Sequence, residues 1–308
     1  MTVLLEKRFN IEPINGIEII KISTPKDLEK YENSEVSVIC GSRAIAAAAD
    51  KLSFPNLKLV QLTSAGFDGV PIESYAKKNI AVANAGAVYS VPIAETVIFG
   101  ILQMVKKIRK NPNNRHFKLT RGYNTITELA GKKFLIMGAG NIGSAVADRL
   151  MGFDVEIDAY DPYCPLKPQY KKILRTIDEL KENLIRYDYI ISTLPDNEQT
   201  RGFINRELFV CMKKTVVIVN VGRQSVFNKN DFYLALKNKN IGGAVLDMFE
   251  VLPNPITNKF RRLVNVIVWP GLSAISKELN LRLTEHMTAN VNAVLELGQI
   301  RSVVNGVK

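Results

Sequence analysis

The sequence has little of the chemistry that marks secreted or metal-binding proteins. Its three cysteines, Cys40, Cys164 and Cys211, are widely separated and form no CxxC pair. This odd and dispersed set excludes a disulfide framework, predicts no metal site and indicates free thiols that are mostly buried. Only two histidines are present, His116 and His286, so few side chains are available for imidazole chemistry.

Long apolar runs are also missing. The first ten residues, MTVLLEKRFN, contain too short an apolar run and too early a charge cluster for a signal peptide. A later run, VIFGILQMV, is only about half as long as a membrane-spanning segment. With 46% hydrophobic and 23% charged residues, the composition is that of an ordinary globular protein. We therefore expect a cytoplasmic protein that does not enter a membrane.

A concentrated block of positive charge is absent, although the formal net charge is +11. The lysines and arginines are spread along the chain, and no basic tail or basic block with interleaved aromatic residues occurs. This distribution argues against a nucleic-acid partner. A diffuse positive field would instead attract a carboxylate substrate or a cofactor that contains a pyrophosphate.

Short β-branched runs alternate with helical or polar segments along most of the chain, and its 308 residues favour two domains. This alternation predicts an α/β fold with parallel sheets. The nearly continuous apolar runs indicate strands that helices cover on both faces. The expected strands lie within residues 16–22, 35–40, 57–62 and 80–84 in a first series, and within 132–140, 155–161, 188–194, 215–222, 242–249 and 265–271 in a second.

Two long helices are expected beside these strands. Residues 91–108 have apolar positions at a helical period and a lysine-rich end, which suits a helix C-terminus, so we interpret them as the helix that joins the two domains. Residues 276–299 predict a C-terminal helix that returns to the first domain. Its expected N-cap is Ser276, with Glu278 close behind.

The motif GAGNIG, at residues 138–143, follows one predicted strand and precedes a helical segment. Gly138 permits the tight turn, Gly140 lets backbone amides approach a pyrophosphate, and Gly143 lets helix and strand pack closely. The next strand ends at Asp161, about twenty positions further on, where a carboxylate can accept hydrogen bonds from a ribose. Strand, glycines, helix and acid in this order predict a dinucleotide site.

The same acidic residue bears on which dinucleotide is bound. Asp161 would repel a 2′-phosphate, and the residues that follow it, Pro162 and Tyr163, supply no positive charge. NAD is therefore the expected cofactor. Lys167 and Lys171 lie further along the same segment and leave NADP open as the alternative.

From Leu62 onward, five motifs in order resemble the D-isomer-specific 2-hydroxyacid dehydrogenase family, whose members include phosphoglycerate, glycerate, hydroxypyruvate and formate dehydrogenases. The motifs are SAGFD at 64–68, NAGAVYSVPIAE at 84–95, STLPDNEQTRGFI at 192–204, the segment around NVGR at 220–223, and GGAVLDMFEVLP with NVIVWPGLSAIS at 242–276. The resemblance implies two doubly wound domains: a flavodoxin-like substrate domain, residues 1–96 and 277–308, and an inserted Rossmann NAD-binding domain, residues 97–276.

The resemblance also implies roles for individual residues. Arg223 matches the family arginine that holds the substrate carboxylate and polarises its carbonyl, a task that suits a planar guanidinium. The turn of Ser64, Ala65, Gly66 and Phe67 matches the segment that receives the same carboxylate. Asp247 matches the acceptor of the nicotinamide amide. The implied cofactor contacts are Gly138, Gly140, Asn141, Ile142, Gly143, Asp161, Leu194, Pro195, Thr200, Val221, Gly222, Asp247 and Gly271.

The sequence departs from the family at its catalytic acid pair. Leu252 stands where the family has a glutamate, and Gly271 stands where it has the histidine that delivers a proton to the carbonyl oxygen. Glu250 lies two residues before the first position, on the same face of an extended backbone, and is a candidate substitute. The loss of both partners predicts a slow or differently tuned enzyme.

Other proton donors can be enumerated. His286 is expected on a helix surface or between domains, and His116 in a loop that, in this family, runs near the dimer contact. Ser273, Trp269, Tyr89 or an ordered water are further candidates to line the space beside Gly271.

Two functions follow from these observations. The first is an NAD-dependent oxidoreductase that interconverts a small 2-oxo acid and its D-2-hydroxy acid. The second is a catalytically weak or inactive NAD(H)-binding sensor of the same fold. The retained Arg223 and Asp247 favour the first, and the missing acid pair favours the second. The resemblance further implies a homodimer formed through the cofactor domains.

Overall fold

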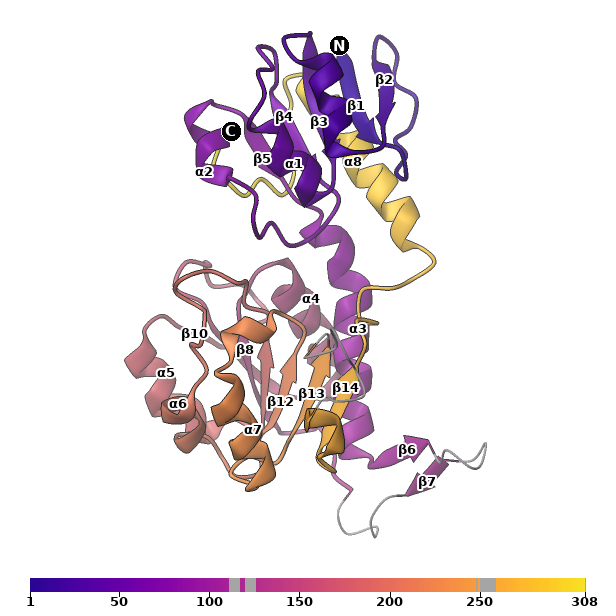
Figure 1. Ribbon diagram of the computed structural model, residues 1–308. Coiled ribbons are helices and arrows are strands. Elements are labelled where there is room, and N and C mark those ends of the chain that lie inside the picture. Colours follow the sequence, from indigo (N-terminus) through magenta and orange to yellow (C-terminus); the bar gives the residue numbers. More distant parts are fainter. Residues whose placement is uncertain (111–116, 120–125, 248, 250–258, 308) are drawn as a thin grey trace. The chain divides into compact units, whose positions relative to one another are not determined.

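The computed structural model describes residues 1–110, 117–119, 126–247, 249 and 259–307. Within them the chain forms two compact units, Met1–Tyr89 with Ser276–Lys308 and Ser90–Ile275 (Figure 1). The sequence predicts boundaries at 96/97 and 276/277 instead. The first of these falls inside α3 (Gly86–Val105), a continuous helix in which no sequence signal marks where one unit ends. The roles assigned to the two domains stay predictions.

Unit 1, formed by residues 1–89 and 276–308, is built on a parallel sheet of five strands in the order β2-β1-β3-β4-β5. This order is the flavodoxin-like one, which confirms the predicted fold class. All four predicted strands of the first series are present, and the sequence reading missed β1. The strands are β1 (Thr2–Glu6), β2 (Glu18–Ile22), β3 (Val36–Gly41), β4 (Leu59–Leu62) and β5 (Ala81–Ala83).

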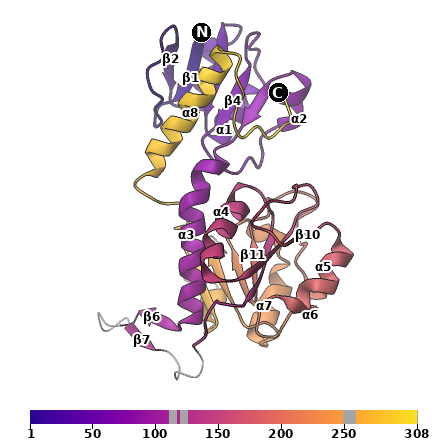
Figure 2. The same ribbon diagram turned by 180° about the vertical axis from the view of Figure 1, so that it is seen from behind.

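Both faces of this sheet are covered, because its strands alternate apolar side chains between two cores. In β1, Leu4 belongs to the core on one face, while Val3 and Leu5 belong to the core on the other. The first core contains residues of the 3-10 helix η1 (Pro25–Tyr31), α1 (Arg43–Ala49) and α2 (Ile72–Lys77). The second is closed by α8 (Leu279–Leu295), as the views from opposite sides show (Figures 1 and 2).

The C-terminal helix starts later than the sequence predicts. Its N-cap is Glu278, which has helical backbone angles and makes no side-chain cap bond, so the expected cap at Ser276 is wrong. The serine instead lies in the turn that precedes the helix. As predicted, α8 packs in the first unit, through Leu283, Met287 and Val291.

Unit 2, residues 90–275, contains a parallel sheet of seven strands in the order β10-β9-β8-β11-β12-β13-β14. The six predicted strands of the second series are all present, and a short edge strand, β10, was not predicted. The strands are β8 (Lys133–Met137), β9 (Glu156–Tyr160), β10 (Lys172–Leu174), β11 (Tyr189–Ser192), β12 (Val217–Asn220), β13 (Gly243–Asp247) and β14 (Val266–Trp269). The chain order reverses at β8, whose neighbours are β9 and β11.

Helices cover this sheet on both faces as well. In Figures 1 and 2, α3 and α4 lie on one face and α5, α6 and α7 on the other. Their bounds are α4 (Asn141–Leu150), α5 (Ile177–Asn183), α6 (Arg206–Val210) and α7 (Lys229–Lys237), with 3-10 turns at Met151–Phe153, Leu184–Arg186, Gln224–Val226 and Lys259–Arg262. An antiparallel pair, β6 (Ile108–Lys110) and β7 (Phe117–Leu119), follows α3.

The helix α3 lies close to its sheet because Gly100 leaves room for an aromatic ring. A Cβ atom at Gly100 would lie 2.4 Å from the indole of Trp269 and 2.8 Å from Val245. The indole also stacks on Phe99, with ring centroids 6.1 Å apart. Within the described chain α3 is the one helix long and apolar enough to cross a membrane. Just over half of its most apolar window is buried, and a core helix passes the same test.

The three cysteines are free. Cys40 is buried in β3, and burial raises the pKa of its thiol to about 12. Cys164 and Cys211 are only half-buried, so the prediction of mostly buried thiols holds for one of the three.

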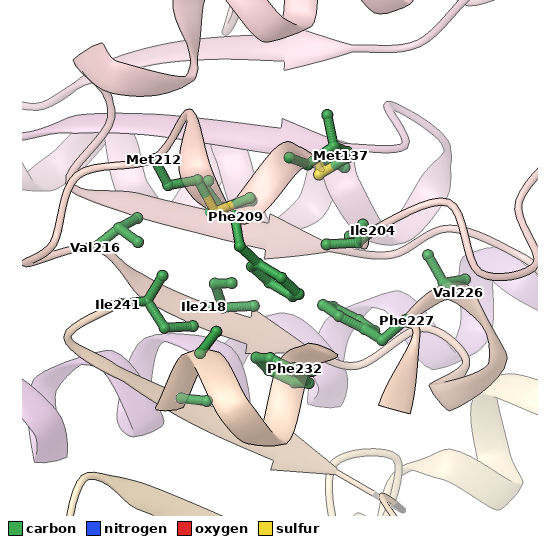
Figure 3. Close-up of a cluster of buried hydrophobic side chains, with 14 of the residues drawn as sticks. Met137, Ile204, Phe209, Met212, Val216, Ile218, Val226, Phe227, Phe232 and Ile241 are labelled. Carbon is green, nitrogen blue, oxygen red and sulfur yellow. The ribbon is translucent and has the colours of Figure 1, made fainter. Parts of the chain in front are cut away.

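Aromatic rings stack on one another in the core beneath α6 and α7 (Figure 3). Phe232 is fully buried, and its ring stacks on Phe209 at 5.5 Å and on Phe227 at 4.6 Å between centroids. Such pairs add to the free energy gained from burial alone. Phe232 therefore fixes α7 against the sheet that carries the site described below.

Replacing Phe232 with alanine should lower the free energy of unfolding by about 3–5 kcal/mol, because the cavity cannot close around two stacked rings. Leu234 lies two residues away on the same helix and is 49% exposed, so its replacement by alanine should cost less than about 1 kcal/mol. Urea denaturation followed by circular dichroism measures both. Equal losses for the two variants would contradict this assignment of the core.

Candidate functional site

The predicted cofactor residues of the second unit gather at one edge of its sheet, where its parallel strands end. Since the strand order reverses at β8, this edge is where doubly wound sheets bind ligands. The residues that follow or end the strands are Gly138 after β8, Asp161 after β9, Leu194 and Pro195 after β11, Val221, Gly222 and Arg223 after β12, Asp247 in β13 and Gly271 after β14.

The glycine turn has the geometry that its sequence predicts. Gly138 has φ +96°, a conformation that side chains other than glycine rarely adopt, and its oxygen accepts a hydrogen bond of 2.8 Å from the Thr193 hydroxyl. A Cβ atom at Gly143 would lie 2.0 Å from the Gly138 oxygen, so helix α4 can approach the turn only with glycine there. By contrast, a Cβ atom at Gly140 would meet no atom within 4 Å.

Helix α4 presents donors toward that open space. Gly140 is its N-cap, and the first bond is made by the Ser144 N–H to the Gly140 oxygen. The N–H groups of Asn141, Ile142 and Gly143 therefore lack a partner within the helix. No acidic residue stands in the first turn to compete for them. Free donors beside an open glycine fit a diphosphate.

Asp161 is held by backbone donors on three sides. Its Oδ2 accepts from the Ala139 N–H at 2.9 Å, and its Oδ1 accepts from the N–H groups of Tyr163 and Cys164 at 2.9 Å each. A carboxylate has about four acceptor sites, so one remains at Oδ2 beside the glycine turn. The carboxylate is thus oriented and still able to accept a ribose hydroxyl, which fits the predicted cofactor.

The chain that follows β12 contacts the end of β11 and the loop after it. Both Val221 and Gly222 donate from their N–H groups to the Ser192 oxygen at 3.1 Å, and a Cβ atom at Gly222 would lie 2.6 Å from the Leu194 oxygen. Thr200 donates from its hydroxyl to the Pro195 oxygen at 2.6 Å, which ties the loop into a turn.

Unsatisfied polar groups lie beneath these loops, at the ends of two central strands. Ser192 of β11 and Asn220 of β12 are opposite each other and fully buried. The Ser192 hydroxyl and both side-chain amide atoms of Asn220 have no hydrogen-bond partner among the described residues. Buried polar groups are costly to leave unpaired, so this edge is suited to binding further polar atoms.

Asp247 is engaged in a way that the sequence does not reveal. Its Oδ1 accepts from the N–H groups of Gly271 at 2.8 Å and Leu272 at 3.1 Å. Its Oδ2 accepts from both the N–H and the hydroxyl of Ser273. All four acceptor sites of the carboxylate are used by this turn. Binding of a nicotinamide amide by Asp247 therefore requires one of these bonds to be displaced, and that role stays a prediction.

The backbone of Gly271 has a conformation that residues with a side chain rarely adopt. Its φ is +81°, in the region that favours glycine, and its N–H is held by Asp247. A histidine at this position would have to take the same backbone angle, at a cost of about 1–2 kcal/mol. The turn is therefore shaped for glycine.

In the first unit, the predicted substrate turn follows β4. The Ser64 hydroxyl donates to the Gly66 oxygen at 2.7 Å, and the Asn84 side chain donates to the Ala65 oxygen at 2.8 Å. Over the described part of the chain, the N–H groups of Ala65 and Gly66 have no acceptor. Phe67 completes the turn and packs against the core. Two adjacent free donors on a fixed turn suit a carboxylate.

His286 is not exposed on the helix surface, which was one of its two predicted locations. It is 7% exposed, inside the first unit, and its Nε2 lies 2.9 Å from the Asn84 oxygen. Burial, and to a smaller extent Arg301, lowers the pKa of the imidazole below its ordinary 6.5, although the contact with Asn84 opposes the shift. Leu283 and Met287 pack beside it in α8, which explains why a helical histidine is buried.

The other candidate proton donors are committed to local bonds or packing. The Ser273 hydroxyl donates to Asp247, and the Tyr89 hydroxyl donates to the Thr63 oxygen at 2.8 Å. Burial raises the pKa of Tyr89. Trp269 packs on α3. His116, Glu250 and Leu252 lie outside the described residues.

Fold and site together define two units in the chain, a Rossmann dinucleotide-binding unit and a flavodoxin-like unit. Residues 96–273 match the family model described as D-isomer specific 2-hydroxyacid dehydrogenase, NAD binding domain. The chain belongs to the D-isomer specific 2-hydroxyacid dehydrogenase family and contains its NAD-binding domain. The resemblance on which the sequence-based predictions rest is thereby confirmed at the level of the family.

Relatives of this chain are named for several different activities. The chain is 29% identical over 298 residues to D-3-phosphoglycerate dehydrogenase of Methanocaldococcus jannaschii, covering 96% of this chain and 56% of that protein. It is 31% identical over 267 residues to hydroxypyruvate reductase of Thermotoga maritima, and this match covers 84% of this chain and 86% of that protein. The chain thus spans little more than half of the first relative.

Solved structures share the fold. An NADPH-dependent glyoxylate/hydroxypyruvate reductase from Sinorhizobium meliloti, in complex with NADP and malonate, superposes with a TM-score of 0.74 at 22% identity, covering 99% of this chain and 97% of that one. At this identity the likeness shows the architecture alone.

Alanine at Gly140 should abolish dinucleotide binding without loss of stability, since its Cβ would enter the open space beside α4 and touch no protein atom. Gly152→Ala is the matched control, because its Cβ also meets nothing within 4 Å but lies after the end of α4. NADH fluorescence titration and thermal unfolding measure both properties. Unchanged NADH affinity in Gly140→Ala would place the diphosphate elsewhere.

The lowered pKa of His286 makes stability depend on pH. Folding favours the neutral ring, so this contribution is present above pH 6.5 and is lost as the pH falls through the lowered folded-state pKa. We expect the free energy of unfolding to decline below pH 6.5, and His286→Gln to decline less steeply. Denaturant titrations between pH 5 and 8 compare the two slopes. Identical slopes would show that His286 does not titrate between the folded and unfolded states.

Proposed function

We propose that the chain is an NAD-dependent oxidoreductase that interconverts a small 2-oxo acid and its D-2-hydroxy acid. One observation carries this proposal. The open glycine turn, the free N–H groups of α4, Asp161 and Arg223 lie at the same edge of one parallel sheet. Family membership supports the same class of reaction.

In this proposal each element has a chemical task. The N–H groups at the start of α4 bind the diphosphate, and Asp161 binds the ribose beside it. A nicotinamide held at this edge would supply or accept the hydride of the reaction. Arg223 holds the substrate carboxylate and draws electron density toward the carbonyl oxygen. The turn at Ser64–Phe67 offers its backbone donors to a carboxylate.

Proton delivery is the distinctive part of the proposal. The hydroxyl groups of Ser273 and Tyr89 already donate within the protein, and His286 is buried in contact with a backbone oxygen. We therefore assign proton transfer to a water molecule beside Gly271. A positioned general acid contributes about 10² to 10⁴ in rate, so turnover should be slower by up to that factor than with a histidine.

A second function is favoured by the backbone of Gly271. Its φ of +81° and its bond to Asp247 belong to a turn whose own residues, Gly271 to Ser273, carry no ionisable side chain. A chain that binds dinucleotide but lacks a proton donor would act as an NAD(H) sensor, with binding rather than turnover as its output. We further propose that the protein is cytoplasmic. We also propose that it forms a homodimer, which the mass measured by sedimentation would test.

Turnover with a substrate panel separates the two functions. We expect NADH consumption with glyoxylate, hydroxypyruvate, pyruvate or a longer 2-oxo acid, alongside NADH binding by fluorescence. Arg223→Ala should lower turnover by about 10² or more and leave NADH affinity within twofold, because the arginine acts on the substrate. The control is Arg186→Ala, an exposed arginine bonded to Asn183, which should change neither value.

Each remaining outcome decides between the proposals. NADH binding without turnover across the whole panel would favour the sensor. Absence of NADH binding would remove both. Equal losses in the two arginine variants would show that Arg223 has no specific part in the reaction.

A further inference from the structure

A lysine from the loop after β9 reaches back to the glycine turn. Lys167 is half-buried, and its Nζ lies 2.7 Å from the Ala139 oxygen, inside the GAGNIG motif. The same Nζ lies 2.7 Å from the hydroxyl of Ser144, in the first half of α4. The loop thus brings a positive charge from outside the motif to the place where the cofactor is expected.

The charge of Lys167 is not balanced locally. Among the residues that the structure describes, no carboxylate lies within ion-pair distance of its ammonium, and both of its partners are neutral oxygens. An ammonium has three donors, so one remains. Lys171, four positions along, differs because its Nζ pairs with Glu156 at 3.1 Å.

Ala139 connects this lysine to the ribose-binding acid. Its N–H donates to Asp161 and its oxygen accepts from Lys167, so both side chains are bonded to the backbone of one residue. A second cation, Arg175, donates from its guanidinium to the backbone oxygen of Asp161 at 2.7 Å. Two cations therefore stand around one carboxylate, whose own charge is spread over three backbone N–H groups.

This balance bears on the choice between the two dinucleotides. Asp161 alone would repel a phosphate on the 2′-position of the ribose. A lysine ammonium on the other side of Ala139 attracts the same phosphate as a point charge, and its remaining donor can bond a phosphate oxygen. The guanidinium of Arg175, which donates to the backbone oxygen of Asp161, adds a second positive charge beside this ribose site.

We propose that the ribose site accepts a 2′-phosphate as well as a 2′-hydroxyl, with Lys167 as the residue that binds the phosphate. The chain then takes NADP(H) in addition to NAD(H). This inference rests on the proposed function, because it requires the dinucleotide to lie at the glycine turn. Lys167 acts as a specificity-determining residue, while Asp161 keeps its contact with the unphosphorylated ribose.

Two nucleotide fragments isolate the contact. Calorimetric titration with 5′-ADP measures the diphosphate and adenosine contacts, and 2′,5′-ADP adds the phosphate in question without the nicotinamide. We expect the unmodified protein to bind the two with affinities within about tenfold. Lys167→Met should weaken 2′,5′-ADP by about tenfold or more, the value of one charge-assisted hydrogen bond, and 5′-ADP by less than twofold. Lys167→Arg should restore most of the loss.

Lys171→Met is the control, since it removes a neighbouring lysine whose charge Glu156 already balances. It should alter neither affinity. The selective loss in Lys167→Met should also shrink as salt is raised, because a charge pair causes it.

The possible outcomes distinguish a failure of this inference from a failure of the proposed function on which it rests. If neither fragment binds, the proposed dinucleotide site itself is wrong. If 5′-ADP binds and 2′,5′-ADP binds a hundredfold or more weakly, the dinucleotide site stands and the inference fails. An equal loss of both fragments in Lys167→Met would also overturn it, since the lysine would then only support the glycine turn.

Discussion

The site depends on one steric constraint, the close approach of α4 to the turn after β8. Gly143 lies so near the Gly138 oxygen that no Cβ atom fits between them. This approach places the first N–H groups of α4 beside an open glycine and brings Ala139 within hydrogen-bond distance of Asp161. The loop after β9 also contacts this turn, because Lys167 donates to the Ala139 oxygen. A change of one methyl group at this contact would therefore alter the start of α4 and the bond between Ala139 and Asp161 together.

The strand ends of the second unit bind one another as well as presenting groups to a ligand. Asp247 uses its carboxylate to hold the turn at Gly271–Ser273, and the β12 loop donates to Ser192 of β11. Such bonds keep the edge rigid before anything is bound, which reduces the entropy lost on binding. They also leave few side-chain protons available, which is why water is assigned as the proton source.

Much of the fold could be predicted from the sequence because buried parallel strands are almost uninterrupted apolar runs. The glycine motif and Asp161 could be predicted for the same reason, since their spacing reflects strand and helix lengths. β1 was missed because its apolar residues, Val3–Leu5, are followed at once by charges, although the strand lies inside the sheet. The burial of His286, the engagement of Asp247 and the reach of Lys167 depend on contacts between distant segments, which no local pattern records.

The first unit is closed by α8, which lies almost two hundred residues beyond β5 in the chain. During synthesis, the sheet face formed by Val3 and Leu5 must wait for Leu283 and Met287 to emerge from the ribosome before it is covered. Unit 2 has no such dependence, because its strands and helices are contiguous in the chain. Unit 2 is therefore complete while the sheet of unit 1 still exposes the apolar face that α8 later covers.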